Sequence, residues 1–179
     1  MSWKVLSTEV VFKTPRFDVV QESVVLPNDS IRNFFQLKMA DCSVIMPVTS
    51  DGKIVMLNEY RHACKTKLLT LPGGKFEEGD DAIKTAVKEL KEETGYASDK
   101  MEYIGSFFAD PPRTGRKWHF FIARDVQIVS EQDLTAFEDI EIVLMNPAEL
   151  RSALAEGKVS NLPDMGLIYL GLDRLNFLK

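Results

Sequence analysis

Short runs in which polar and apolar residues alternate occupy the start of the chain and predict strands over residues 3–13, 17–27 and 31–38. A small antiparallel sheet of this kind has little core of its own. We therefore expect it to pack against the rest of the chain or against a second subunit. Further strands are predicted at 42–48, 53–60, 103–108, 118–123 and 140–145, with a hairpin turn at Asp51–Gly52 between the first two of these. Residues 68–71 form a short apolar piece.

Helical patterns lie between the later strands. The longest of the N-terminal two thirds covers residues 80–94, and Gly95 follows in the position expected of a helix C-cap. Two more helices are predicted over 147–156 and 162–178. This order favours an α/β (α+β) fold with a mixed sheet covered by helices. We expect two regions, a small antiparallel β subdomain over 1–40 and a larger domain over 41–179.

Composition narrows the functional classes. The chain has 179 residues, 22 Lys and Arg against 27 Asp and Glu, and a net charge of −5. This acidic balance argues against a nucleic-acid-binding protein, which needs a basic face. No apolar run reaches the length of about 18 residues that a membrane helix requires, so we expect no membrane partner. The start lacks the apolar core of a signal peptide, which favours a cytoplasmic protein.

The helix predicted over 80–94 carries an unusual charge pattern. At about 100° per residue, Ile83, Ala86 and Val87 fall within about 60° of Leu90 and define the expected buried stripe. The acidic side chains of Glu89, Glu92 and Glu93 share one flank of the helix. Glu89 and Glu93 form a like-charge i, i+4 pair, which is mildly destabilising. A divalent cation bound by oxygen would offset this repulsion. The helix alone also fits a solvated acidic face.

The residues before the helix extend the pattern. Leu71-Pro72-Gly73-Gly74 is a glycine-rich turn, and the stretch from Gly74 to Tyr96 reads GKFEEGDDAIKTAVKELKEETGY. It resembles the Nudix box, G-x5-E-x7-R-E-U-x-E-E-x-G-U, in which U is apolar. The matching positions are Gly74, Glu89, Leu90, Glu92, Glu93, Gly95 and Tyr96. Asp80 and Lys88 stand where the family has Glu and Arg, an acid–base pair that bridges the motif structurally.

The resemblance implies a Nudix-like α/β/α sandwich with a mixed sheet and a metal-dependent hydrolase that uses Mg²⁺ or Mn²⁺. Glu89, Glu92 and Glu93 are then the expected metal ligands, together with the backbone carbonyl of Gly73. Glu92 and Glu93 are also expected to be catalytic. Two metals held about 3.5–4 Å apart suit attack of water on a pyrophosphate.

Outside the box, the chain is similar to the ADP-ribose and nucleoside-diphosphate-sugar pyrophosphatase branch of the family. That similarity implies that Arg61 and Pro111 bind substrate and that Glu138 is the general base. Arg113 and Arg116 are candidate phosphate ligands, although a solvated turn explains them equally well. The branch also implies a homodimer built through the N-terminal sheet.

The expected substrate is ADP-ribose or a related nucleotide sugar, cleaved to a nucleoside monophosphate and a sugar phosphate. GDP-sugars, dinucleotides and nucleoside triphosphates remain alternative substrates. A Nudix-fold sensor that binds a nucleotide sugar without cleaving it remains the alternative from another class.

Overall fold

A computed structural model describes residues 3–178. The two expected regions, 1–40 and 41–179, therefore include three residues, 1, 2 and 179, that lie outside the described residues. The chain divides into two compact units. The first unit combines Met1–Asp41 with Phe108–Trp118, and the second combines Cys42–Phe107 with His119–Lys179.

The first unit is built on an antiparallel sheet of β1 (Lys4–Lys13), β2 (Asp18–Val25) and β3 (Ile31–Lys38), in that order. It confirms the small N-terminal antiparallel sheet. Val20 and Val24 on the central strand are each 4% exposed. The outer strands leave large apolar side chains in solvent, and Phe12 and Phe35 are each 60% exposed. The sheet is therefore thin, as its pattern predicted.

The segment Phe108–Trp118 packs within the first unit, although it lies far along the sequence from the N-terminal strands. The Leu37 backbone N–H donates to the Arg113 carbonyl at 2.7 Å, and the Lys117 N–H donates to Asp41 Oδ1 at 2.8 Å. The expected region 41–179 thus contains a segment that the structure assigns to the same unit as the N-terminal sheet.

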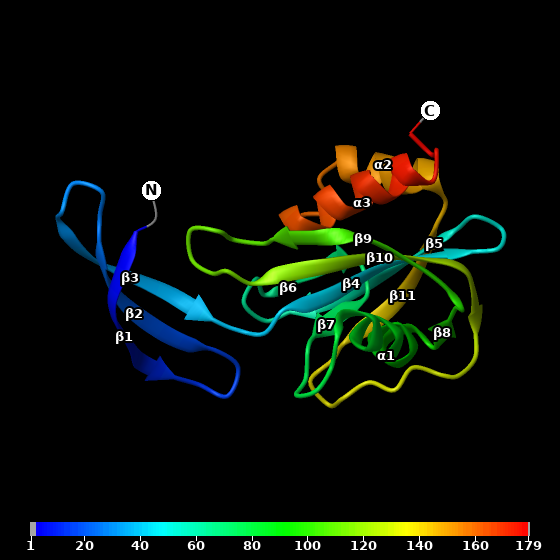
Figure 1. Ribbon diagram of the computed structural model, residues 1–179. Coiled ribbons are helices and arrows are strands. Elements are labelled where there is room, and N and C mark those ends of the chain that lie inside the picture. The colour runs from blue at the N-terminus through cyan, green and yellow to red at the C-terminus, as the bar shows by residue number, and fades with distance from the viewer. Residues whose placement is uncertain (1–2, 179) are drawn as a thin grey trace. The chain divides into compact units, whose positions relative to one another are not determined.

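The second unit is an α/β/α sandwich, and it confirms the predicted fold class. Its sheet follows the order β11-β5-β4-β10-β8, with β6 paired to β5, β7 paired to β4, and β9 paired to β10. Helix α1 covers one face of this sheet, and α2 and α3 cover the other (Figure 1). The bounds of these elements are β4 (Cys42–Thr49), β5 (Ile54–Arg61), β6 (Thr66–Thr70), β7 (Gly73–Lys75), α1 (Ala82–Thr94), β8 (Tyr96–Ala97), β9 (Lys100–Phe108), β10 (Lys117–Ile128), β11 (Ile140–Met145), α2 (Pro147–Ala155) and α3 (Leu162–Arg174).

The core of the second unit lies on both faces of β4, because successive side chains of a strand point to opposite faces. Ile45 belongs to the cluster that packs with Ala86 and Leu90 of α1. Met46 faces α3, where a methyl group added to Gly171 would lie 2.1 Å from the Met46 sulfur. Helix α3 therefore approaches the sheet closely at Gly171.

The predicted buried stripe of α1 is wrong at two positions. Ile83 is 41% exposed and Val87 is 46% exposed. The buried residues of α1 are Thr85, Ala86, Leu90, Glu93 and Thr94. The helix is rotated so that its glutamate flank, rather than Ile83 and Val87, turns toward the protein.

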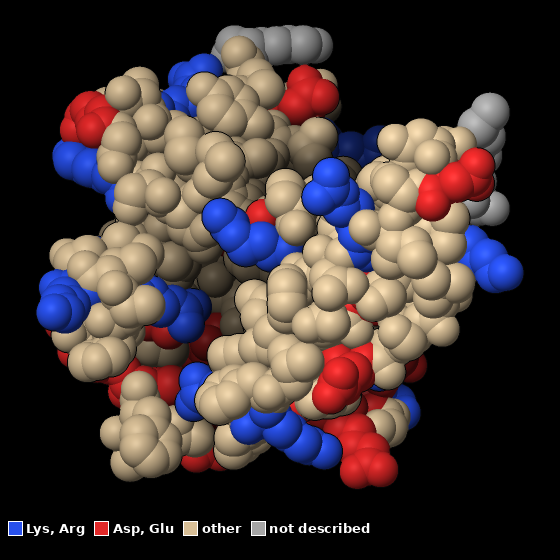
Figure 2. Space-filling view, turned by 90° about the vertical axis from the view of Figure 1, so that its left-hand side faces the viewer, with Lys and Arg blue, Asp and Glu red and all other residues tan. Residues whose placement is uncertain are grey.

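Charged side chains of both signs are interspersed with large uncharged areas on the face shown in Figure 2. Among the described residues, no helix is both long enough and apolar enough to cross a membrane.

Candidate active site

Helix α1 carries the acidic residues of the candidate site and is fixed at both ends. Asp81 is its N-cap and accepts a hydrogen bond from the Lys84 N–H at 2.9 Å. Gly95 ends the helix with a left-handed φ of 72°, as the sequence predicted. A side chain at Gly95 would also collide with the Ser130 carbonyl, because the added Cβ would lie 2.2 Å from that oxygen.

The turn between β6 and β7 brings Gly73 against the helix. The Gly73 N–H donates to Glu93 Oε2 at 2.8 Å, and the Ile45 N–H donates to the Pro72 carbonyl at 2.9 Å. A Cβ on Gly73 would lie 2.3 Å from the Ser43 carbonyl oxygen. Only glycine therefore lets the turn pass this close to β4.

Gly74 makes room for a second glutamate. A Cβ at this position would lie 2.1 Å from Oε1 and 2.7 Å from Oε2 of Glu89. The carboxylate of Glu89 thus lies directly against the backbone of the turn. The two glycines of the motif have separate roles, since Gly73 accommodates β4 and Gly74 accommodates Glu89.

Burial and mutual repulsion disfavour the charged forms of these carboxylates. Burial, followed by the charge of Glu92, raises the pKa of Glu89 to about 7. Glu93 is 7% exposed, and burial raises its pKa well above the ordinary value although the Gly73 N–H opposes this shift. Glu92 is only partly buried. A bound cation would favour the charged forms and offset both costs.

The donors are hard oxygen atoms, which are the ligands that Mg²⁺ and Mn²⁺ prefer. Glu89, Glu92, Glu93 and the Gly73 carbonyl could supply them. Among residues 3–178, no three acidic, His or Cys side chains form a ready-made metal site. The residues present fit a divalent cation in chemistry and charge, and the side chains would adjust to reach it.

A second acidic group lies at the end of β5. Glu59 is 6% exposed, and its Oε2 is 2.6 Å from Nη2 of Arg61, whose side chain is about half exposed. Burial raises the pKa of Glu59, and the charge of Glu138 adds to the shift while Arg61 opposes it. Arg61 therefore presents its guanidinium at the strand end while a buried carboxylate holds it.

Glu138 lies in the loop between β10 and β11. Its Oε2 accepts a hydrogen bond from the Thr135 N–H at 2.7 Å. Its charge raises the pKa of both Glu59 and Glu89, so Glu138 lies within electrostatic reach of the acidic group. The end of its loop is anchored by Lys67, whose Nζ is 3.0 Å from Asp139 and 2.9 Å from Glu141.

The start of the same loop caps the C-terminal end of α1. The Gly95 carbonyl accepts hydrogen bonds from the N–H groups of Val129 and Ser130, and the Glu92 carbonyl accepts one from Asp133. Gln132 Nε2 donates to the Glu93 carbonyl at 2.6 Å. These contacts satisfy carbonyls that a helix end leaves free.

The acid–base pair expected from the motif differs in this chain. Among the described residues, Lys88 forms its ion pair with Glu77, at 2.8 Å, and not with Asp80. The lysine ammonium is a compact charge without the planar fork of a guanidinium, which can hold a carboxylate through two parallel hydrogen bonds. The Lys88–Glu77 ion pair still ties α1 to the loop before it. Its acidic partner, Glu77, is not the residue that the motif indicated.

The remaining candidate substrate residues belong to the first unit. Pro111, Arg113 and Arg116 lie in the segment Phe108–Trp118. Arg113 Nη1 is 2.7 Å from Asp110 Oδ2, within its own turn. Their contribution to substrate binding stays a prediction.

Two residues near the turn were missed by sequence reasoning, Glu59 and Asp164. Asp164, in the first turn of α3, is 2% exposed and accepts a hydrogen bond from Asn161 Nδ2 at 3.1 Å. Burial raises the pKa of Asp164 to about 7. Glu59 had a signal, since an acid that follows the apolar run Ile54–Leu57 in one strand needs a partner where it is buried. Asp164 had none, because its burial depends on how α3 packs in the fold, which a local pattern does not display.

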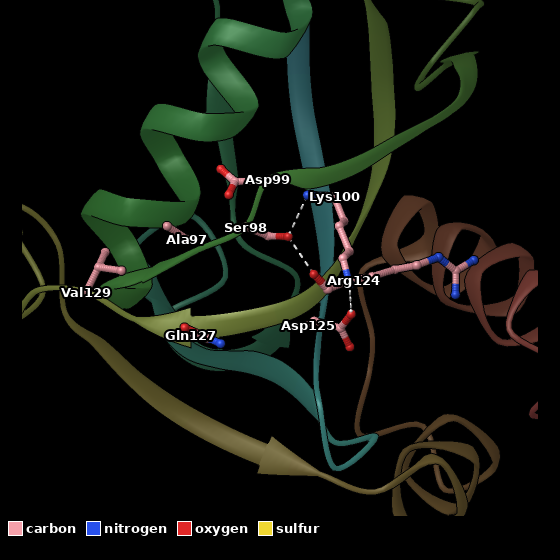
Figure 3. A pocket seen from close by; sticks show the side chains of 8 residues that line it. All are labelled: Ala97, Ser98, Asp99, Lys100, Arg124, Asp125, Gln127 and Val129. Atoms are coloured by element: carbon pink, nitrogen blue, oxygen red, sulfur yellow. Dashed lines mark hydrogen bonds and ion pairs between the residues drawn. The ribbon is translucent and has the colours of Figure 1, made fainter.

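Two grooves of about 300 Å³ each lie on the second unit. In the groove of Figure 3, Ser98 hydrogen-bonds to Arg124 and Lys100, and Lys100 pairs with Asp125. None of the motif glutamates lines it. The other groove runs between α1 and the loop after β10, and Glu92 lines it with Lys88, Lys91 and Asp133.

Comparison with known proteins agrees with this geometry. Residues 39–165 match the NUDIX domain family. The chain is 30% identical over 141 residues to an ADP-ribose pyrophosphatase of Bacillus subtilis, covering 78% of this chain and 76% of that protein. It is 28% identical to a methanol dehydrogenase activator of Bacillus methanolicus, covering 84% of this chain and 80% of that protein.

A solved structure of an ADP compounds hydrolase superposes with a TM-score of 0.83 at 19% identity, covering 99% of this chain and 97% of that one. The protein therefore belongs to the NUDIX family, and it is a Nudix hydrolase.

Proposed function

We propose that this protein hydrolyses the pyrophosphate bond of a nucleoside diphosphate linked to another group, most simply ADP-ribose or a related nucleotide sugar. The products are a nucleoside monophosphate and a sugar phosphate. The observation that carries the proposal is the placement of Glu89 and Glu93 against the Gly73–Gly74 turn, with both carboxyl pKa values raised. The name of the B. subtilis relative supports ADP-ribose as the first substrate to test.

The metal in this proposal is Mg²⁺ or Mn²⁺. Glu89, Glu92, Glu93 and the carbonyl of Gly73 would hold it. When bound, it neutralises the charge of the pyrophosphate and lowers the pKa of a bound water. The protein's own part is to hold Glu89 and Glu93 against the turn, which Gly73 and Gly74 make possible, and a bound cation would favour their charged forms.

Glu138 is the proposed general base. It would accept a proton from the attacking water as a new bond forms between water oxygen and phosphorus and the bond to the bridging oxygen breaks. Its carboxylate now accepts a hydrogen bond within its own loop, so a change in that loop would bring it to the water. Arg61 is the proposed phosphate ligand of β5, and Pro111, Arg113 and Arg116 are proposed to contact the rest of the substrate.

The test is product release from ADP-ribose, GDP-mannose, dinucleotides and nucleoside triphosphates, with and without Mg²⁺. Glu93→Gln keeps the size of the side chain and should lower turnover by orders of magnitude. Glu78→Gln, which changes an exposed acid of the loop before α1, should leave turnover unchanged. Cleavage of a nucleotide sugar that needs Mg²⁺ and is lost in Glu93→Gln would support the proposal. Tight binding without cleavage of any compound would instead favour a sensor.

We also propose that the protein is a homodimer that uses the first unit. Val5, Val10, Ile31 and Phe35 of β1 and β3 are all more than a third exposed, which is unusual for a thin sheet that stays in solvent. Light scattering after gel filtration would give the mass. Replacing Phe12 and Phe35 by Ser should then shift a dimer toward the monomer of 20.3 kDa.

A further inference from the structure

Glu59 is a buried acid to which the proposed chemistry gives no part. Its side chain is buried, whereas the side chain of Arg61, two residues further along β5, is 49% exposed. Residues two apart in a strand share a face, so the carboxylate meets the guanidinium directly, with Oε2 of Glu59 2.6 Å from Nη2 of Arg61. A carboxylate enclosed by protein is costly unless a partner compensates its charge, and Arg61 is that partner.

The sheet fixes Glu59 more firmly than it fixes Arg61. Glu59 lies between two neighbouring strands, opposite Ile140 of β11 and Leu68 of β6. Residues directly opposite in paired strands share a face, so apolar side chains flank Glu59 on both sides. Arg61 is the last residue of β5, and half of its long side chain is exposed to solvent. The position of the guanidinium therefore depends on Glu59, and not the reverse.

The backbone around this ion pair is joined to two parts of the candidate active site. The Tyr60 N–H donates at 3.0 Å to the carbonyl of Asp139, the residue that follows the proposed base Glu138. On the other side, β6 pairs with β5 and leads into the turn whose Gly73 N–H donates to Glu93 at 2.8 Å. Both connections are backbone hydrogen bonds or strand pairings, so they hold the end of β5 in a fixed place beside the site.

The ion pair leaves most of the guanidinium available. A guanidinium carries five N–H donors in a planar fork. Among residues 3–178, Arg61 contacts one carboxylate, through Nη2. The exposed half of the side chain keeps further donors in reach of a ligand. A phosphate group can accept two parallel donors from such a fork, so the direction in which the fork points decides how well it binds.

We infer that Glu59 is a positioning residue that orients the Arg61 guanidinium toward a phosphate group of the substrate. This role rests on the proposed function, in which Arg61 is a phosphate ligand. Glu59 acts through Arg61 and does not contact the substrate. A carboxylate that instead competed with phosphate for Arg61 would have the opposite effect on KM, so the two arrangements are separable.

The kinetic test is a double-mutant cycle of Glu59→Gln and Arg61→Ala, with kcat and KM measured for ADP-ribose in Mg²⁺. Glu59→Gln keeps the shape of the side chain and removes its charge. We expect KM to rise roughly fivefold, with kcat within about twofold of wild type, because the lost interaction binds ground state and transition state alike. Arg61→Ala should raise KM at least roughly tenfold. Adding Glu59→Gln to Arg61→Ala should have no further effect, because Glu59 then has no guanidinium to orient.

A second measurement needs no turnover. The Nε–H signal of Arg61 in NMR spectra reports the motion of its side chain, and a titration with inorganic pyrophosphate through the same signal gives a Kd. In Glu59→Gln the Arg61 side chain should become as mobile as that of Arg151, an exposed residue of α2 that forms no ion pair within the described part of the chain. The Kd for pyrophosphate should rise roughly fivefold in the same variant.

The matched control is Asp51→Asn. Asp51 forms an ion pair of 3.4 Å with Lys53, in the turn that precedes β5 at its opposite end. Breaking this pair removes one charge near the same strand but leaves Glu59 and Arg61 as they are. We expect neither KM nor the Arg61 signal to change.

Three results would overturn the inference. A lower KM or Kd in Glu59→Gln would show competition, an unchanged Arg61 signal would show that Glu59 does not orient the guanidinium, and a KM effect that persists in Arg61→Ala would show that Glu59 acts by another route. Failure of the proposed function looks different. The wild-type protein would then cleave no diphosphate, while the NMR measurements would still report whether Glu59 orients Arg61 toward phosphate.

Discussion

Replacing Gly74 by Ala should disable the site without unfolding the protein. Gly74 is not among the glycines with positive φ, so alanine can adopt its backbone conformation. The obstacle is Glu89, because the added methyl carbon would lie 2.1 Å from Oε1, 2.3 Å from Cδ and 2.7 Å from Oε2. Glu89 is therefore forced to move.

The size of the movement follows from the contact distances. Ordinary contact begins near 3.4 Å, so the Glu89 carboxylate must retreat by roughly 1 Å or more. A misplacement of about 1 Å in a catalytic group costs roughly 100-fold in rate. We expect a fall in kcat/KM of that order. Since the colliding atoms are the end of a flexible side chain, the free energy of unfolding should drop by only about 1 kcal/mol.

The assay compares Gly74→Ala with Gly73→Ala and Gly166→Ala in turnover, Mn²⁺ affinity and melting temperature. Gly73→Ala meets the Ser43 carbonyl, a backbone atom that cannot move aside, and should lose stability as well as activity. Gly166→Ala meets no atom within 4 Å and should behave as wild type or be slightly more stable. Wild-type turnover in Gly74→Ala would show that the position of Glu89 does not matter to the reaction.

Further predictions concern the pH dependence of stability, the proposed general base Glu138, and the loop that carries Glu138. The folded pKa values of Glu89 and Asp164 are raised to about 7 from ordinary values of 4.5 and 3.8, so the unfolded chain releases these protons first. Stability of metal-free protein should therefore fall by several kcal/mol as pH rises from about 4 to 7, and level off above. Urea unfolding across this range checks this prediction, and a stability that rises with pH would contradict it. Glu138→Gln should still bind substrate but turn over at least 100-fold more slowly; unchanged turnover would assign the base to another acid of the loop. Lys67→Met removes the ion pairs to Asp139 and Glu141, so it should speed amide exchange over residues 136–141 and lower kcat severalfold. The control Lys65→Met should do neither. Equal exchange rates in the two variants would show that Lys67 does not anchor the loop.

The parts of the site that sequence could predict are those fixed by local chemistry. The glutamates of α1 follow a helical period, Gly95 ends the helix, and the two glycines precede it at fixed spacing. Helix α1 begins at Ala82, after the N-cap Asp81, close to the predicted start at residue 80. Such features depend on neighbours within a few residues, which a sequence displays directly.

Tertiary packing decided the remaining features. Lys88 could reach either Glu77 or Asp80, and only the path of the intervening loop selects Glu77. The segment Phe108–Trp118 lies in the unit of the N-terminal sheet, and the hydrogen bond from the Leu37 N–H to the Arg113 carbonyl is between backbone groups, which leave no residue pattern. Ile83 and Val87 belonged to the expected apolar stripe, but a helical wheel gives angles and not the direction of the neighbouring sheet.

The rotation of α1 has a consequence for stability as well as for chemistry. It leaves Ile83 and Val87 in solvent while it buries Glu93, a choice that hydrophobic burial alone would not favour. The turn compensates only in part, with one N–H donated to the Glu93 carboxylate, and the pKa of that group stays well above its ordinary value. A helix that buries a carboxyl group and exposes two apolar residues is poorly arranged for a protein without ligands. It is well arranged for a protein in which a divalent cation binds beside the helix, because the same burial that destabilises the isolated charge strengthens its attraction to the cation.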